Sequence, residues 1–284
     1  MVAPEEPHRP RPHAPRPHAP RAARALVWSR AMDGQAALLL FVAGLVGGVV
    51  TAIVGGASLI TFPALLAAGL PAIVANASNT VAMTPGNLIA AVADLQVRPR
   101  WDRSFVGLVL VCVAGSVAGA ALLLVTPEKA FTAIVPLLVG FATVLFAASS
   151  SIRRWITVRR AGRRGTRLTL LLFAPVAVYG GYFGAGMSVM LLALLSVTRA
   201  DDFRATNVLK NLLSGLTGLV AVVVFVGQGV VAWVPALAMM AGALVGGFLG
   251  GRLVRVLPPA VVRWVVIAAG TVLTAVYAWR YWLR

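Results

Sequence analysis

A single charged side chain interrupts a long hydrophobic stretch in the second half of the chain. Lys210 is the only charged residue between Ala205 and Gly251, and Asn207 and Asn211 flank it. The four-residue spacing of the asparagines places both amides on one face of a helix. A charge within a membrane-spanning helix marks a solute pathway, unless the side chain reaches the headgroups from a helix end. We therefore expect either a cationic binding site or a lysine that snorkels.

Glycines interrupt the hydrophobic sequence at two places. Gly55 and Gly56 precede the stretch 57–70, which is too short to span a membrane, and a second glycine cluster lies inside the uncharged run 168–198. A helix broken there directs the free N–H groups and positive dipole end of its second part into the interior, where an anion binds. The predicted substrate-binding residues are Lys210, Asn207, Asn211, Asn79, Tyr179, Tyr182, Gly184, Gly186, Gly55 and Gly56.

Residues typical of enzymes are missing from the hydrophobic part of the sequence. All three histidines, His8, His13 and His18, lie near the N-terminus, and no GxxxxGK[ST] phosphate-binding loop occurs. We therefore predict no catalytic residue, no metal site and no cofactor. The Pro- and Arg-rich N-terminal stretch is predicted to be a disordered tail beside anionic headgroups. A metal bound by its histidines is less favoured, because nothing fixes their geometry.

Composition and the spacing of charges predict the fold class. Of the 284 residues, 60% are hydrophobic and 12% are charged, against about 45–50% and about 25% in ordinary soluble domains. The uncharged runs approach or exceed the ~20 apolar residues that a spanning helix needs. The sequence predicts an all-α polytopic transmembrane helix bundle of about 8 segments in the cell membrane. The net charge of +17 reflects the positive-inside bias and not a nucleic-acid partner.

The two halves of the chain resemble each other. A shift of 128 residues places Asn79 on Asn207, and a shift of 132 places Trp101 on Trp233. Duplicated halves with glycine-interrupted helices in matching positions are typical of secondary transporters. The predicted divisions are a disordered tail over 1–33, a first transmembrane repeat over 34–150, an Arg-rich cytoplasmic linker over 151–167 and a second transmembrane repeat over 168–284.

Two glycine pairs have a different interpretation. Gly115 and Gly119, and likewise Gly247 and Gly251, are spaced by four residues. Small residues at this spacing let the backbones of two membrane helices approach closely. We interpret both pairs as positions of helix packing.

Charge alone leaves the orientation of the second half open. The linker contains seven arginines between residues 149 and 167 and is expected in the cytoplasm. If 168–198 crosses the membrane once, Arg252, Arg255 and Arg263 face outward. If it forms a re-entrant hairpin, those three come inside and the halves become inverted repeats. The same hairpin in the first half would place the basic N-terminal tail outside.

The glycine breaks and the polar residues that follow them resemble the sulfite exporter TauE/SafE family of membrane permeases, over about residues 36–282. The matching stretches are Gly44–Pro63 with Asn79-Thr80, and Tyr179–Gly186 with Ala205–Asn211. Gly-Gly-Ala-Ser at 55–58 departs from the longer glycine run of the family.

This resemblance implies a permease that exports sulfite or a small organosulfonate. The expected partners are then a small anionic solute, the lipid bilayer and, in a homodimer, a second copy of the chain. A non-transporting membrane assembly or scaffold protein is the alternative. Duplicated broken helices disfavour it, since a scaffold has no need of unwound backbone within hydrocarbon.

Overall fold

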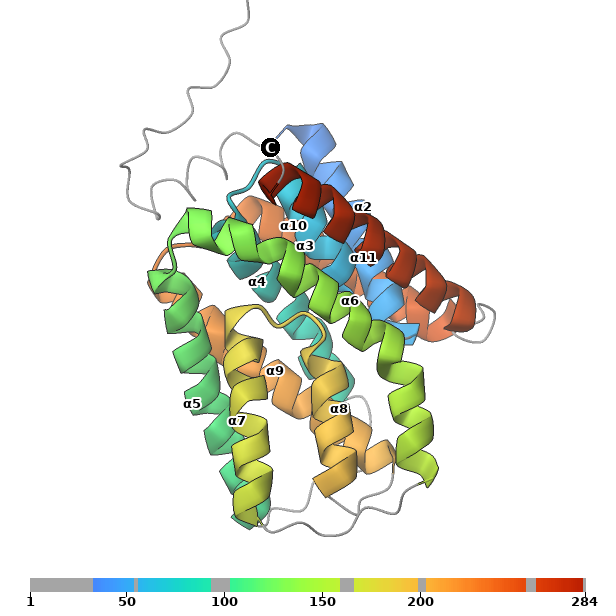
Figure 1. The fold of residues 1–284 in the computed structure, drawn as a ribbon. Coiled ribbons are helices and arrows are strands. Elements are labelled where there is room, and N and C mark those ends of the chain that lie inside the picture. The colour runs from blue at the N-terminus through green and yellow to red at the C-terminus, as the bar shows by residue number, and fades with distance from the viewer. Residues whose placement is uncertain are drawn as a thin grey trace, which may run out of the picture.

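The described part of the chain is entirely helical. The computed structural model describes residues 33–53, 56–92, 103–158, 166–198, 203–253 and 259–282. Within these residues ten helices form one bundle (Figure 1). Their bounds are α2 Gly34–Ile53, α3 Ser58–Ala67, α4 Ala72–Val92, α5 Arg103–Val125, α6 Glu128–Val158, α7 Thr166–Tyr182, α8 Met187–Thr198, α9 Phe203–Gly227, α10 Trp233–Leu253 and α11 Pro259–Trp282.

Six of the described helices are long and apolar enough to cross a membrane, namely α2, α5, α6, α9, α10 and α11. Helix α4 has a similar length but carries several polar side chains, including Asn76, Ser78 and Asn79, which are all buried. Large apolar side chains such as Leu110 and Val223 are exposed instead. The prediction of an all-α polytopic membrane bundle is confirmed.

The short helix α3 folds back along α2. Residues 54–57, which we call the first break, separate the two helices. A side chain added at Gly47 of α2 would lie 2.6 Å from the methyl group of Thr61 in α3. Since these positions lie on opposite sides of the break at similar separations from it, α2 and α3 form an antiparallel hairpin.

The second half contains the same arrangement. Residues 183–186, which we call the second break, separate α7 from α8. Gly180 of α7 lies against Met187 of α8, and Figure 1 shows the two helices next to each other. The run 168–198 therefore forms a hairpin of two helices, as the re-entrant layout requires, and not one continuous helix.

Contacts between the other helices fix their relative directions. Helix α2 runs parallel to α10 and α5 runs parallel to α7, whereas α4 is antiparallel to α9 and α6 is antiparallel to α11. The contacting positions are Gly44 with Met239 and Gly48 with Ala243, Gly115 with Ala177 and Gly119 with Val178, Thr84 with Gly218 and Leu88 with Gly215, and Gly140 with Thr274 and Thr143 with Gly270.

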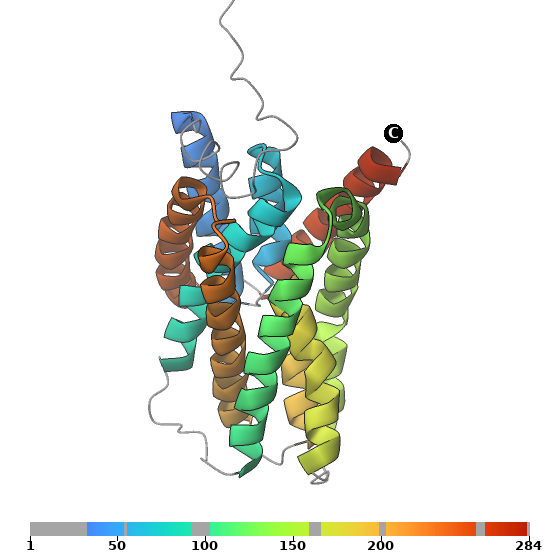
Figure 2. The same ribbon diagram turned by 90° about the vertical axis from the view of Figure 1, so that its left-hand side faces the viewer.

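These directions sort the connections onto two sides of the bundle. Toward one side, helices α4, α6, α8 and α10 end and helices α5, α7, α9 and α11 begin. The short turns 68–71, 126–127 and 228–232 join helix ends on the other. Helix α2 begins, and α11 ends, on this second side, as Figure 2 shows.

Glycines bring two helix pairs into backbone contact. In the pair α5 and α7, a side chain at Gly119 would collide with the carbonyl oxygen of Val178. In the pair α2 and α10, a side chain at Gly246 would collide with the carbonyl oxygen of Leu45. Gly247, which we predicted as a packing position, has no atom within 4 Å of an added Cβ. Its backbone nitrogen nevertheless lies 2.6 Å from the position of a Cβ added at Gly48, so Gly247 belongs to the close approach of α2 and α10, and the glycine whose own Cβ would collide lies one residue earlier.

Helix α6 extends past the candidate membrane span. The span ends at Ser149, but the helix continues to Val158. Roughly half of the predicted linker 151–167 is therefore helical, since its residues sustain the helix once it has started. The tail up to residue 32 and the segment 159–165 lie outside the described residues.

Candidate functional site

Glycines with positive φ form both breaks. The φ angles are +87° at Gly56, +77° at Gly184 and +79° at Gly186, a region that side chains with a Cβ rarely adopt. Gly55, the other predicted glycine, lies outside the described residues. The first N–H groups of a helix have no partner within that helix. Each break therefore presents a helix N-terminus, of α3 or of α8, inside the bundle.

Both breaks contact the same part of α6. A Cβ at Gly56 would lie 2.7 Å from the ring of Phe146, and a Cβ at Gly186 would lie 3.4 Å from Ala142. Phe146 and Ala142 are four residues apart and share one face of the helix. The N-termini of α3 and α8 are thus brought to neighbouring positions along one helix face.

A buried polar cluster lies beside the first break. The Thr61 hydroxyl donates to the Asn79 side-chain oxygen at 2.6 Å, and the Asn79 amide nitrogen donates to the Ser58 hydroxyl at 3.3 Å. Asn79 is 3% exposed. Because the Ser58 hydroxyl accepts the bond from Asn79, its own proton is left to donate to another group. Asn79 is therefore held at the start of α3.

Aromatic rings surround the second break. The ring of Phe183 lies edge-on to three others, with centroid separations of 5.2 Å to Phe62, 6.5 Å to Phe131 and 6.3 Å to Tyr179. The ring of Tyr182 lies 5.7 Å from that of Phe131. Edge-to-face pairs of this kind add to the stabilisation from burial. The second break is therefore enclosed by close packing.

Hydrogen bonds also satisfy the backbone of the second break. The Tyr179 hydroxyl donates to the Ala185 carbonyl at 2.6 Å, and the Asn76 amide donates to the Tyr182 carbonyl at 3.0 Å. The Tyr179 carbonyl accepts the N–H groups of Phe183 and Gly184. Tyr179 and Tyr182, which we predicted to bind substrate, thus lie at the break, and the hydroxyl of Tyr179 already supports its fold.

The predicted polar group on α9 lies apart from the breaks. Helices α4 and α9 are in register at Thr84 with Gly218 and at Leu88 with Gly215. Continued at ~1.5 Å per residue, this register places Lys210 level with the end of α4, about 20 Å along the axis from Asn79. Asn207, Lys210 and Asn211 are all half-buried. The structure therefore divides the predicted site residues into a central group and a group near the start of α9.

Sequence reasoning missed several polar residues that the structure places at the breaks. Ser58 and Thr61 bond Asn79 from α3, and Asn76 holds the second break from one turn earlier on α4. These residues could have been found in the sequence as polar side chains that recur every three or four residues within otherwise apolar helices. Arg263 was considered only with Arg252 and Arg255, as a guide to orientation, and the structure places it inside α11.

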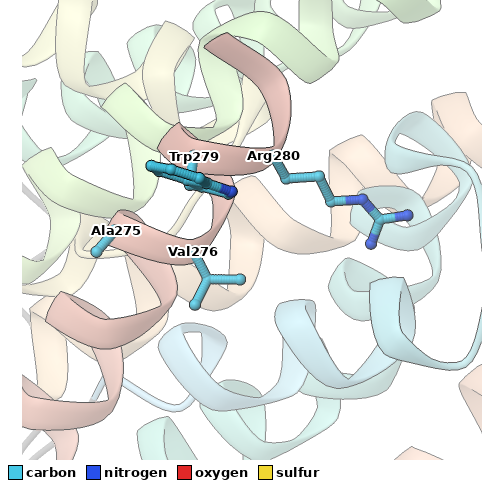
Figure 3. Close-up of a pocket in the computed structure, with 4 residues that line it drawn as sticks. All are labelled: Ala275, Val276, Trp279 and Arg280. Carbon is cyan, nitrogen blue, oxygen red and sulfur yellow. The ribbon is translucent and has the colours of Figure 1, made fainter. Parts of the chain in front are cut away.

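An open hollow of about 500 Å³ lies elsewhere, on the surface of α11 (Figure 3). Its lining residues are Ala275, Val276, Trp279 and Arg280. All four belong to one helix, and Figure 3 shows Trp279 and Arg280 projecting from it in different directions. The hollow is a feature of the helix surface and lies away from both breaks.

Long apolar helices with two re-entrant half-helices define a multi-pass membrane protein of the transporter class. The model of the family described as "Sulfite exporter TauE/SafE" matches residues 40–277. The chain therefore belongs to the TauE/SafE family of membrane transporters.

Individual relatives agree with this family. A probable membrane transporter protein of Haemophilus influenzae is 28% identical over 239 residues, which cover 84% of this chain and 92% of the relative. The probable membrane transporter protein YfcA of Escherichia coli K12 is 26% identical over 244 residues, covering 84% of this chain and 87% of YfcA. The probable membrane transporter protein ORF9 of Sinorhizobium is 28% identical over 215 residues, covering 75% and 81%. No solved structure matches the chain.

Proposed function

We propose that the chain is a secondary transporter that exports a small anion, sulfite or an organosulfonate, across the cell membrane. The observation that supports this proposal is the approach of both breaks to Ala142 and Phe146 of α6. Two helix N-termini at neighbouring positions add the positive ends of two helix dipoles, while the N–H groups of Leu59 and Met187 bond the Gly56 and Gly184 carbonyls of the breaks. Such an arrangement suits a negatively charged solute.

The charges of the described helices also favour an anion. Lys210 and Arg263 lie within candidate membrane spans. The acidic residues among the described ones are Asp33 and Glu128, which lie at the starts of α2 and α6. The Glu128 carboxylate accepts the N–H of Ile73 at 3.2 Å, at the N-terminus of α4. Neither of these two acids lies at a break, so the membrane-embedded charges among the described residues are positive.

We assign the side on which α4 ends and α5 begins to the cytoplasm. In the sequence, fourteen arginines lie between or next to the helix ends of this side, against six in the N-terminal tail. With a hairpin in each half, the start of α11 with Arg263 lies toward the same side as the end of α6. The positive-inside bias then favours this orientation, although it leaves the N-terminal tail outside.

We further propose that the two halves are inverted repeats. The pair α2 and α10 corresponds to the pair α7 and α5, and the pair α3 and α4 corresponds to α8 and α9. In the pair α4 and α9, each helix is the counterpart of the other in the opposite half of the chain. The same holds for the pair α6 and α11. Because α2 enters from outside and α7 from the cytoplasm, the halves have opposite orientations. Transporters built in this way alternate by rocking one repeat against the other.

Flux measurements in proteoliposomes test the proposed function. We expect saturable flux of sulfite or ethanesulfonate above that of empty liposomes, and weaker flux of sulfate and carboxylates. The same panel with and without a pH gradient shows whether protons drive it. A cysteine introduced at the half-buried Asn207 in a Cys112→Ser background reports solvent access. Absence of flux, together with no maleimide labelling from either side, would support the scaffold alternative.

Lys210, Asn207 and Asn211 line the cytoplasmic approach to the breaks in this proposal. We expect Lys210→Ala to insert normally but to abolish protection of cells against sulfite, because an intramembrane cation attracts the anion. Lys129→Ala is the control, since Lys129 is exposed at the opposite side of the bundle. Unchanged export by Lys210→Ala would remove this lysine from the mechanism.

A further inference from the structure

Arg263 is a cation inside a membrane-spanning helix. It lies one turn into α11, within the candidate span Ala260–Trp282, and is half-buried. Its Nη2 donates to the carbonyl oxygen of Ala147 in α6 at 2.7 Å. Its Nε is buried and has no hydrogen-bond partner among the described residues. A guanidinium has five N–H donors, so most of its capacity is not used by the described part of the chain.

Two observations place Arg263 beside the first break. Ala147, which accepts its hydrogen bond, directly follows Phe146, whose ring lies against Gly56. The shift of 132 residues that relates the two halves places Arg263 on Phe131. Phe131 packs against the second break, through the rings of Tyr182 and Phe183. Arg263 thus occupies at the first break the position that an aromatic ring occupies at the second.

We propose that Arg263 is the cationic ligand of an oxyanion-binding site at the first break. This inference rests on the proposed function and names the charged residue of its site. Nε and one Nη of a guanidinium bind two oxygens of a sulfite, sulfonate or carboxylate in parallel. The N-terminus of α3 and the free hydroxyl proton of Ser58 supply further donors.

The site is closed in the conformation described here. Because Nε is buried, an anion reaches it only when the guanidinium moves away from the Ala147 carbonyl. Bidentate geometry favours an ion with two oxygens on one atom over a spherical ion. The site is therefore expected to bind ethanesulfonate and sulfite more tightly than chloride.

Ligand-dependent thermal unfolding of the purified full-length protein in detergent tests this site. Ethanesulfonate, sulfite and chloride are titrated separately, and the rise of the unfolding temperature with concentration gives an apparent affinity. We expect Arg263→Gln to weaken binding of ethanesulfonate and sulfite at least tenfold, and Arg263→Lys to weaken it less. Arg280→Gln, on the exposed surface of the same helix, is expected to stay within twofold of the parent.

The outcomes separate the inference from the proposed function. Ethanesulfonate binding by Arg263→Gln within twofold of the parent overturns the inference, and so does a parent protein that binds neither oxyanion. Binding that Arg263→Gln loses, in a protein without flux in proteoliposomes, supports the inference and overturns the transport proposal. Flux in proteoliposomes, together with ethanesulfonate binding that Arg263→Gln leaves unchanged, supports the transport proposal and overturns the inference.

Arg263→His keeps the test decisive if the glutamine variant does not fold. Histidine is a cation only below about pH 6.5, whereas ethanesulfonate is an anion at all pH values used. We expect this variant to bind ethanesulfonate at least fivefold more tightly at pH 5.5 than at pH 8, with a smaller change in the parent. Equal binding at both pH values would show that no cation is needed at this position.

Discussion

The first and second breaks have similar backbones and different surroundings. Each contains a glycine with positive φ, begins a short helix and contacts one face of α6. The second break is enclosed by aromatic rings, and Asn76 and Tyr179 bond its carbonyls. The first break adjoins the polar cluster of Ser58, Thr61 and Asn79.

This difference indicates that the two breaks have different roles. Tight packing and satisfied carbonyls hold the second break in one conformation. The first break has polar donors and, in our proposal, the guanidinium of Arg263. In our proposal, the second break therefore serves rigidity and the first break serves binding. The variants below test this assignment.

Phe183→Ala is expected to have the largest effect. Phe183 is 4% exposed and its ring contacts three others, and truncation of a buried Phe costs about 3–5 kcal/mol. Phe141→Ala is the control, because Phe141 is 48% exposed and pairs only with Tyr179 among the described rings. Thermal unfolding in detergent measures both. Equal losses would show that the second break does not depend on its aromatic core.

Gly246→Ala and Gly247→Ala compare neighbouring positions on α10, next to the helix that leads into the first break. The added methyl collides with the Leu45 carbonyl at Gly246 and meets nothing at Gly247. We expect a loss of about 3 kcal/mol for Gly246→Ala, and no loss or a gain of up to about 1 kcal/mol for Gly247→Ala. The unfolding temperatures of the two variants in detergent measure these changes in stability. A similar result for both variants would contradict the close approach of α2 and α10.

Asn76→Ala and Asn79→Ala separate stability from binding. Asn76→Ala leaves the Tyr182 carbonyl without its donor, which costs about 1–3 kcal/mol, while ethanesulfonate affinity stays within twofold. Asn79→Ala frees Ser58 and Thr61 at the first break and is expected to lower the affinity at least fivefold. Titration and unfolding are measured on the same samples. An affinity loss confined to Asn76→Ala would reverse the assigned roles of the breaks.

Tyr179→Phe is expected to have the smallest effect. The variant keeps the ring contacts and removes only the bond from the hydroxyl to the Ala185 carbonyl. One hydrogen bond contributes about 1 kcal/mol, so the unfolding temperature falls slightly and transport persists. A complete loss of flux with an intact fold would instead make the hydroxyl a ligand of the solute, as the sequence alone suggested.

The sequence was sufficient for the membrane class, for most helices and for the positions of both breaks. Long uncharged runs and clustered glycines are local signals, so they can be read without a structure. The hairpin at 168–198 was left open, because glycine permits a reversal of the chain without requiring one. The charge pattern supported both layouts until the contacts between helices had fixed their directions.

The details of the site depended on packing and were predicted less well. Asn79 and Lys210 each lie about two turns into their helix, but α4 and α9 are antiparallel, so the two residues lie toward opposite ends of this helix pair. Gly247 was chosen over Gly246 by spacing alone, and one residue turns a helix face by about 100°. Arg263 lay near other arginines in the sequence, so only the start of α11 revealed it as an intramembrane charge.

The bond between Arg263 and the Ala147 carbonyl has a consequence for how tightly a solute is held. A solute that binds this guanidinium replaces a carbonyl as its acceptor, so binding is an exchange and its net free energy is small. Release follows the same exchange in reverse, with the carbonyl ready to take the guanidinium back. Weak, quickly reversed occupancy of this kind suits a protein that must let its cargo go in every cycle.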